Sequence, residues 1–455
     1  SDVFEEPAMK FSAKITAPLL ALALSMTACA AAPDAAITAS TAPTPAAEST
    51  PQLSTDLTAI TTWSGFAMGQ NAVYNVMNVN GEGRYFATTI DLTTGQQQIL
   101  CYKPNCPHED DTCPGFMAQS ASGAVPTAYL IPAPDRLYWI IDGRFNDSCG
   151  AYVDVSDLDG RNRHRIVEGD DLPDLGVVNN WYADGRALYT TYYSGSDFLI
   201  LRIDETGAAV IGQKTRSDSE WYHAVGCWQD KIILQHNEYY YIPELKKAGN
   251  TATEEEYDAW YDEQDAAQLT QPVSLYLLGT DREEHPLDFH WTVTDGAIAK
   301  VQNGIVYLLS PGGTVTQMNL STGSSTTQSF DLPGQAVPDD PDILPGNWAS
   351  VYITDLGNGN NECLLNLDTG EFQPQPTTWF KDQAAPRCPI IWAADHGMLF
   401  LQYGEVYYTE KGIGPDGLPA SYTVGRNEYG IISFDDYLAG SQDWVHVTLL
   451  GDDFA

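Results

Sequence analysis

The sequence has little positive charge. Its 455 residues include 22 Lys and Arg against 61 Asp and Glu, which gives a formal net charge of −39. A field of this sign repels nucleic acids and anionic surfaces, so we expect no nucleic-acid partner. The acidity is compatible with a surface for a cationic partner. It also keeps an exposed protein soluble, and this second interpretation is the one that we favour.

Common catalytic motifs are also missing. The sequence contains no G-x-S-x-G nucleophile elbow, phosphate-binding glycine loop, dinucleotide fingerprint or H-E-x-x-H zinc helix. The usual hydrolase, NTPase and dehydrogenase classes therefore lack support from motifs. A catalytic site remains an open alternative, because a repeat scaffold can assemble one from distant segments.

No apolar run is long enough to cross a bilayer, which takes about 20 residues. The run after Met9, in MKFSAKITAPLLALALSMTAC, follows two lysines and ends with a small residue before Cys29. This layout predicts an export signal over residues 9–28. Residues 1–8 precede a good start methionine and are acidic where signals are basic, so we interpret them as upstream or non-native.

The end of this signal resembles a lipobox, although Met26 stands where such motifs usually carry Leu, Val or Ile. The resemblance implies lipid on Cys29 and anchoring at the outer face of a bacterial cytoplasmic membrane. A secreted protein with a chance cysteine is the alternative. Residues 29–55 are almost all Ala, Thr, Pro and Ser, a composition that predicts a flexible tether before one large domain over residues 56–455.

That domain repeats one pattern: a β-prone run, a turn carrying Asp, Asn, Thr or Gly, and a second β-prone run. Seven copies begin at Tyr85, Ala151, Phe198, Ser274, Thr314, Cys363 and Gly430. Repeats of this length with almost no helix favour an all-β fold, a β-propeller of about seven four-stranded blades. Glycines suited to positive φ stand in the hairpin turns at Gly95, Gly160, Gly207, Gly323 and Gly370.

Each copy follows another apolar run, which we interpret as the inner strand of its blade. These runs begin at Ala72, Leu137, Ala187, Lys231, Ile305, Ser350 and Met398. The last copy has no obvious fourth strand. We therefore expect residues 57–68 to complete the last blade and remove the exposed sheet edges.

One turn carries a family resemblance. The sequence DLDG, followed by the basic run RNRHRI from Arg161, resembles the hairpins of TolB-type propeller repeats. The chain as a whole is similar to propeller lipoproteins of unknown function from Gram-positive gut anaerobes. This resemblance implies the fold and the cell-surface location rather than an activity.

The densest chemistry lies directly after the first repeat, where Cys101, Cys106, His108 and Cys113 follow a C-x4-C-x-H-x4-C spacing. Three thiolates and an imidazole complete a tetrahedral zinc shell, and such a closed site is structural because no position stays open. A Cys106–Cys113 disulfide is the alternative, since an exported chain leaves the reducing cytosol. Reactive-thiol chemistry is a third possibility.

Long insertions indicate a binding face. The segment 243–272 contains the one convincing helix, with Thr253 and Glu256 as a capping box, and further insertions lie at 143–150 and 409–427. We expect these loops and the cysteine cluster to share one rim. Candidate contact residues are the aromatic side chains Tyr239, Tyr240, Tyr241, Tyr257 and Trp260.

These features lead to two functional hypotheses. The first is a lipid-anchored, non-catalytic propeller that binds a surface glycan, polymer or protein. The second is an extracytoplasmic hydrolase or lyase that acts on a carbohydrate or a peptide.

Overall fold

The structure is a computed structural model. It describes residues 56–450 except 64, 79–82, 120–126, 143–149, 174, 176, 216–219, 239–251, 269, 280–283, 293–297, 311, 335, 354–361, 377–378, 381–382, 385–389, 394–396 and 414–418. The predicted signal peptide, Cys29, the tether and Tyr239–Tyr241 lie outside the described residues. No helix in the described part has the length and apolar character needed to cross a membrane.

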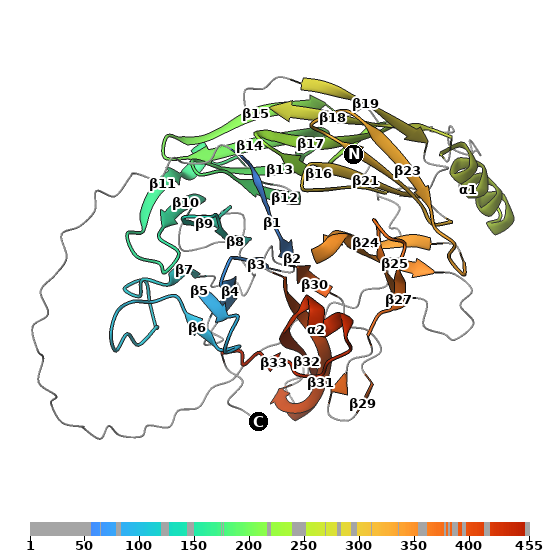
Figure 1. The fold of residues 1–455 in the computed structure, drawn as a ribbon. Coiled ribbons are helices and arrows are strands. Elements are labelled where there is room, and N and C mark those ends of the chain that lie inside the picture. The colour runs from blue at the N-terminus through green and yellow to red at the C-terminus, as the bar shows by residue number, and fades with distance from the viewer. Residues whose placement is uncertain are drawn as a thin grey trace, which may run out of the picture.

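Seven antiparallel sheets form a ring of blades, as Figure 1 shows. Blade 1 consists of β2 (Thr62–Trp63), β3 (Phe66–Met68), β4 (Ala72–Asn78), β5 (Arg84–Asp91), β6 (Gln97–Ile99) and β7 (Phe116–Gln119). Blade 2 consists of β8 (Ala128–Pro132), β9 (Leu137–Ile141), β10 (Tyr152–Ser156) and β11 (His164–Glu168). Blade 3 consists of β12 (Val177–Ala183), β13 (Leu188–Ser194), β14 (Asp197–Asp204) and β15 (Gly207–Thr215), with β1 (Thr58–Ile60) added beside β12.

The remaining blades follow the same order. Blade 4 consists of β16 (Glu220–Trp228), β17 (Lys231–Glu238), β18 (Pro272–Gly279) and β19 (Glu284–Thr292). Blade 5 consists of β20 (Ile298–Gln302), β21 (Ile305–Ser310), β22 (Thr314–Asn319) and β23 (Ser325–Ser329). Blade 6 consists of β24 (Ala336–Leu344), β25 (Trp348–Ile353), β26 (Glu362–Asn366) and β27 (Phe372–Pro374). Blade 7 consists of β30 (Ile390–Ala393), β31 (Met398–Ile413), β32 (Pro419–Ser433) and β33 (Val445–His446).

Shorter elements of the described fold are the 3-10 helices η1 (Gly169–Asp171) and η3 (Pro345–Asn347), the helix α2 (Phe434–Leu438), and the hairpin of β28 (Trp379–Phe380) and β29 (Gln383–Ala384). The predicted all-β propeller of seven four-stranded blades is confirmed. The predicted helix is also present, as α1 (Glu254–Gln268) in blade 4, and its capping box is formed by hydrogen bonds in both directions between Thr253 and Glu256.

The core is divided among the blade interfaces. Most buried apolar residues of the described chain fall into seven hydrophobic clusters. Six of these clusters lie between two adjacent blades, and the one between blades 2 and 3 also includes Ala67 of blade 1. Burial of apolar surface between blades is therefore what holds the ring together. Each blade depends on both of its neighbours for its core.

The five predicted turn glycines join the third and fourth strands of their blades and adopt positive φ, between 67° at Gly323 and 125° at Gly207. An Asp or Asn commonly starts these turns and accepts backbone N–H groups two and three residues on. Asp91, for example, accepts from Thr93 and Thr94, and Asn319 accepts from Ser321 and Thr322. The pattern of the repeat thus encodes one recurring Asx turn.

The predicted inner strands were assigned one position too early. The run from Leu137 forms β9 and the run from Lys231 forms β17, which are second strands, and the innermost strands are β8 and β16. Strand β9 is buried along its whole length, whereas β8 begins with the half-buried Ala128 and Tyr129, so the strongest apolar signal marks the second strand rather than the first. Helix α1 accordingly lies between the second and third strands of blade 4.

The predicted ring closure was also wrong. Residues 57–68 do not join the last blade: β1 pairs with β12 of blade 3, and β2 and β3 pair with each other and, through β3, with β4 of blade 1. Blade 7 obtains its fourth strand from β33, which pairs with β32. The segment after β33 then hydrogen-bonds the β5–β6 turn of blade 1, with 2.9 Å from the Thr448 nitrogen to the Gly95 oxygen. Strand β33 was missed because a strand of two residues is too short to give a recognisable pattern in the sequence.

Candidate metal centre and the adjoining groove

The cysteine loop, residues 100–115, interrupts the outer strand of blade 1. Strand β6 pairs with β5 at Thr88–Ile90, and β7 pairs with the other half of β5 at Arg84–Phe86. The loop leaves the sheet after β6 and returns to it at β7. It therefore lies on the outer edge of blade 1 and is held at both ends by the same strand.

The four predicted ligands meet within this loop. Their ligand atoms, three sulfurs and a histidine ring nitrogen, all lie within 4.8 Å of one another. The His108 Nδ1 atom is 3.2 Å from the Cys113 sulfur. A tetrahedral shell with zinc–sulfur bonds of about 2.3 Å places its ligand atoms about 3.8 Å apart, so a small contraction suffices. The cluster can hold a metal such as zinc.

The backbone of the loop explains this convergence. Asn105 and His108 adopt positive φ, 54° and 55°, and so turn the chain twice between the first and last cysteines. The Cys113 N–H donates to the Asp110 carbonyl, and the Cys113 carbonyl accepts from Phe116. Consecutive turns of this kind bring residues that are 12 positions apart in sequence to one point.

Electrostatics prepare two of these groups to bind a metal. Desolvation acts to raise the pKa of Cys106, but hydrogen bonds from the His108 backbone and from the Cys113 and Cys101 thiols, with the charge of Lys103, lower it overall. Desolvation lowers the pKa of His108, which keeps the imidazole neutral. Burial raises the pKa of Cys113 to about 12. A bound cation would favour the thiolate at Cys113, because metal binding and proton release are coupled.

The cysteines of the described chain are free thiols, namely Cys101, Cys106, Cys113, Cys227 and Cys363. Cys149 and Cys388 lie outside the described residues. Cys106 and Cys113 lie close together as thiols, in an arrangement that is compatible with metal coordination.

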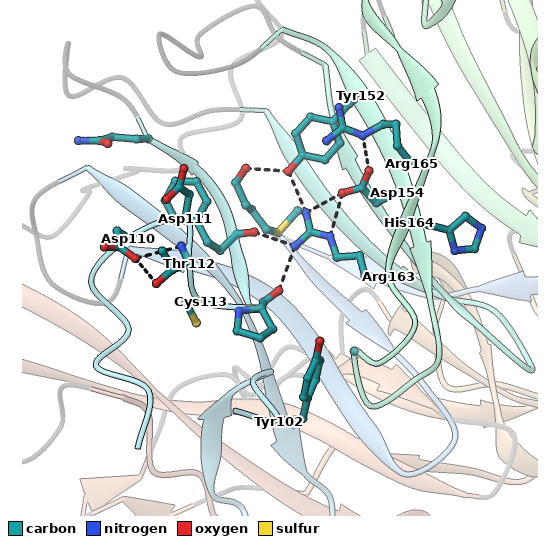
Figure 2. A pocket seen from close by; sticks show the side chains of 15 residues that line it. Tyr102, Asp110, Asp111, Thr112, Cys113, Tyr152, Asp154, Arg163, His164 and Arg165 are labelled. Carbon is teal, nitrogen blue, oxygen red and sulfur yellow. Dashed lines mark hydrogen bonds and ion pairs between the residues drawn. The ribbon is translucent and has the colours of Figure 1, made fainter. Parts of the chain in front are cut away.

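A groove of about 790 Å³ lies between the cysteine loop and blade 2. In Figure 2, Asp110, Asp111 and Thr112 lie on the loop side of this groove, and Tyr152, Arg163 and Arg165 lie on the blade 2 side. Tyr102 and Cys113 also line the groove. Its volume is within the range of small-ligand sites, roughly 300 to 1,000 Å³.

Arg163 fastens the loop to blade 2. Its guanidinium donates to the Pro114 and Phe116 carbonyls at 3.1 and 2.7 Å, binds Asp154 at 2.8 Å and lies over the Trp139 ring. Tyr152 adds a hydroxyl bond of 2.7 Å to the Met117 carbonyl. This wall of the groove was not predicted. The signal was present, because a run with three arginines in a chain of net charge −39 is a local anomaly.

The other predicted contact residues lie elsewhere. Tyr257 on α1 is exposed, and Trp260 is partly buried against the edge of Tyr261 with ring centroids 5.0 Å apart. The expectation that the cysteine loop and the insertions share one rim stays a prediction, because the two occupy different positions within their blades. The cysteine loop interrupts a fourth strand, whereas the insertions at 143–150, 243–272 and 409–427 all connect second and third strands.

The fold and the site define the class of the protein: a seven-bladed β-propeller with a loop on the outer edge of blade 1 whose three cysteines and histidine could ligate a metal. No protein-family model matches the chain. No curated protein matches it either. The family resemblance inferred from the DLDG turn thus stays a prediction.

Several solved structures are similar to the chain. They include dipeptidyl peptidase 4 of Porphyromonas gingivalis, with 10% identity and a TM-score of 0.37 over 88% of this chain. They also include BamB of Moraxella catarrhalis, with 12% identity and a TM-score of 0.29 over 78% of this chain and 82% of that one. Sqt1 of Saccharomyces cerevisiae has 8% identity and a TM-score of 0.35 over 80% of this chain and 90% of that one. The chain spans 60% of the length of the peptidase. These values are low, so the fold assignment rests on the strand pairing described above.

Proposed function

We propose that the protein is a non-catalytic binding propeller, held at the outer face of a bacterial cytoplasmic membrane by lipid on Cys29. A structural zinc ion in the cysteine loop keeps one wall of its binding groove in place. The observation that carries this proposal is the convergence of four soft ligands within 4.8 Å directly beside the groove. A TolB-like origin of the repeats belongs to the same proposal.

The character of the site favours binding over chemistry. Zinc with four protein ligands keeps no open position for a substrate or a water, so its contribution is to folding. The carboxylate and guanidinium groups at the base of the groove bind each other, as Asp154 does with Arg163 and Arg165. Groups paired in this way position a ligand and are poorly suited to proton transfer.

Zinc content tests the metal centre. The purified protein should contain one equivalent of zinc, and Cys106→Ser should lose it. Cys227→Ser is the matched control, because Cys227 is another partly buried thiol and donates to the Leu57 carbonyl far from the cluster. Absence of metal together with a Cys106–Cys113 disulfide on mass spectrometry would contradict the proposal.

Binding and anchoring are tested on bacterial cell envelopes. The zinc-loaded protein should sediment with isolated envelope material, and the Cys106→Ser variant should sediment less. Mass spectrometry of the mature N-terminus should find lipid on Cys29 and none in Cys29→Ala. Equal sedimentation of the zinc-loaded protein and the Cys106→Ser variant would refute the role of the groove. An unmodified Cys29 would refute the lipid anchor.

A further inference from the structure

The base of the groove is locally cationic although the protein is strongly acidic. Asp154 is buried, and each of its two oxygens accepts from a different arginine, Oδ2 from Arg163 and Oδ1 from Arg165. Two guanidinium charges therefore face one carboxylate. One positive charge is left over at the base of the groove.

Arg165 carries this surplus charge. It binds Asp154 through Nε and stacks on the Tyr152 ring at 3.9 Å, which fixes its plane. Its Nη1 atom is 3.6 Å from the Glu168 carboxylate, which is itself 80% exposed and so contributes little. The side chain is 40% exposed, so the fork of its terminal nitrogens is accessible from the groove.

An aromatic face and oxygen acceptors complete the lining. Tyr102 is 51% exposed, the most exposed large hydrophobic residue among those described. A ring in this position offers a flat apolar surface beside a polar groove. Across from Arg165, the loop presents Asp110 and Asp111, and carboxylates accept hydrogen bonds from hydroxyl groups.

We propose that this groove binds a saccharide chain whose sugar rings carry carboxylates. A ring carboxylate pairs with the Arg165 fork, the ring face stacks on Tyr102, and ring hydroxyls donate to the loop carboxylates. This assignment rests on the proposed binding function and gives it a ligand class. The exposed Tyr102 ring favours a sugar ring over an acidic peptide, whose backbone N–H groups can also donate to Asp110 and Asp111. Triglutamate is the probe for such a peptide.

Calorimetric titration with trigalacturonic acid tests the assignment, with maltotriose as the neutral probe of equal length. Trigalacturonic acid should bind and maltotriose should bind at least tenfold more weakly. Arg165→Gln should weaken the acidic probe by about 10- to 100-fold, since a hydrogen bond to a charged group is lost. Tyr102→Ala should weaken it by about fivefold.

Matched controls come from other blades. Arg202→Gln removes an arginine of similar exposure, 38%, that also pairs with an aspartate, and Tyr261→Ala removes a tyrosine that is 49% exposed on α1. Neither should change the affinity. Tyr102 and Tyr261 are both surface side chains, so these two variants give an answer even where Arg165→Gln does not fold.

Failure takes a recognisable form. The proposed ligand class would be wrong if trigalacturonic acid did not bind, or if maltotriose or triglutamate bound as tightly. It would also be wrong if the Arg165 and Tyr102 variants bound trigalacturonic acid as their control variants do. A protein that holds zinc and sediments with envelopes but ignores trigalacturonic acid loses only the ligand class. A protein without zinc and without envelope binding loses the proposed function as well.

Discussion

The cysteine loop of blade 1 and helix α1 of blade 4 are both additions to the ring of blades, but they are attached very differently. The loop is held by β5 at both ends and tied to blade 2 through Arg163 and Tyr152. Helix α1 stands off the ring in Figure 1, with its own capping box as its main described restraint. The difference shows that the length of an insertion does not determine how firmly it is attached, whereas the shorter loop with specific side-chain contacts is joined to the scaffold on both sides.

The largest effect should come from cutting the tie between the loop and blade 2. Arg163→Ala leaves two backbone carbonyls and part of the Asp154 carboxylate without a donor, so unfolding free energy should fall by about 3 to 5 kcal/mol. Arg161→Ala is the control, because Arg161 is 62% exposed and should change stability by less than about 1 kcal/mol. If Arg163→Ala and Arg161→Ala lost equal unfolding free energy in denaturant titrations, Arg163 would not be what ties the loop to blade 2.

Acidification should weaken the interior of blade 4, the blade that carries α1. Burial, together with the charge of Lys300, lowers the pKa of His223 on β16 to about 4. The unfolded chain binds this proton near pH 6.5 and the folded chain does not, so stability should fall by roughly 3 kcal/mol between pH 6.5 and 4. His223→Gln should flatten that part of the stability profile. An unchanged slope would show that His223 titrates normally.

A smaller effect should appear at the base of the cysteine loop. Gly160 has φ +81°, and a Cβ there would lie 3.0 Å from the Leu100 side chain. Gly160→Ala should cost about 2 kcal/mol, because strain and a close contact add. Gly323, with φ +67°, occupies the same turn in blade 5 and has nothing within 4 Å of its Cβ position, so Gly323→Ala should cost about 1 kcal/mol. Reversal of this order in thermal melts would contradict the packing described.

The smallest effect should come from removing α1. Replacement of residues 252–270 by a short Gly/Ser linker should change the unfolding free energy by less than about 1 kcal/mol, because long surface loops are tolerated. Zinc content and envelope binding should not change. A loss above about 2 kcal/mol would show that α1 covers a blade edge and belongs to the core.

The repeated Asx turns explain why the fold could be predicted. In blades 1, 5 and 6 the turn begins with Asp91, Asn319 or Asn366 and carries a glycine at positive φ, so the sequence itself marks the repeat. The candidate metal cluster was predictable for a similar reason, since three Cys and one His within 13 residues are typical of a metal site. These are local requirements, and local requirements are visible in a sequence.

What the sequence did not reveal depends on contacts between distant residues. Strand β33 is two residues long, and its role comes from bonds between Thr448 and the turn at Gly95. The sequence showed Arg163 only as part of a basic run. Its role could not be predicted, because its partners, the carbonyls of Pro114 and Phe116, belong to another blade. Pairings across blades leave no periodic pattern in either segment.

The closure of the ring by residues 445–450 has a consequence for assembly of the chain. Synthesis proceeds from the N-terminus, so six sheets are complete while blade 1 still presents an open side and the cluster around Phe66 and Ile90 lacks its blade 7 half. The last blade of a second chain that is equally incomplete can pack against this open side of blade 1. Exchange of that blade between two copies would form the same bonds, so concentrated refolding should yield domain-swapped dimers that dilute refolding avoids.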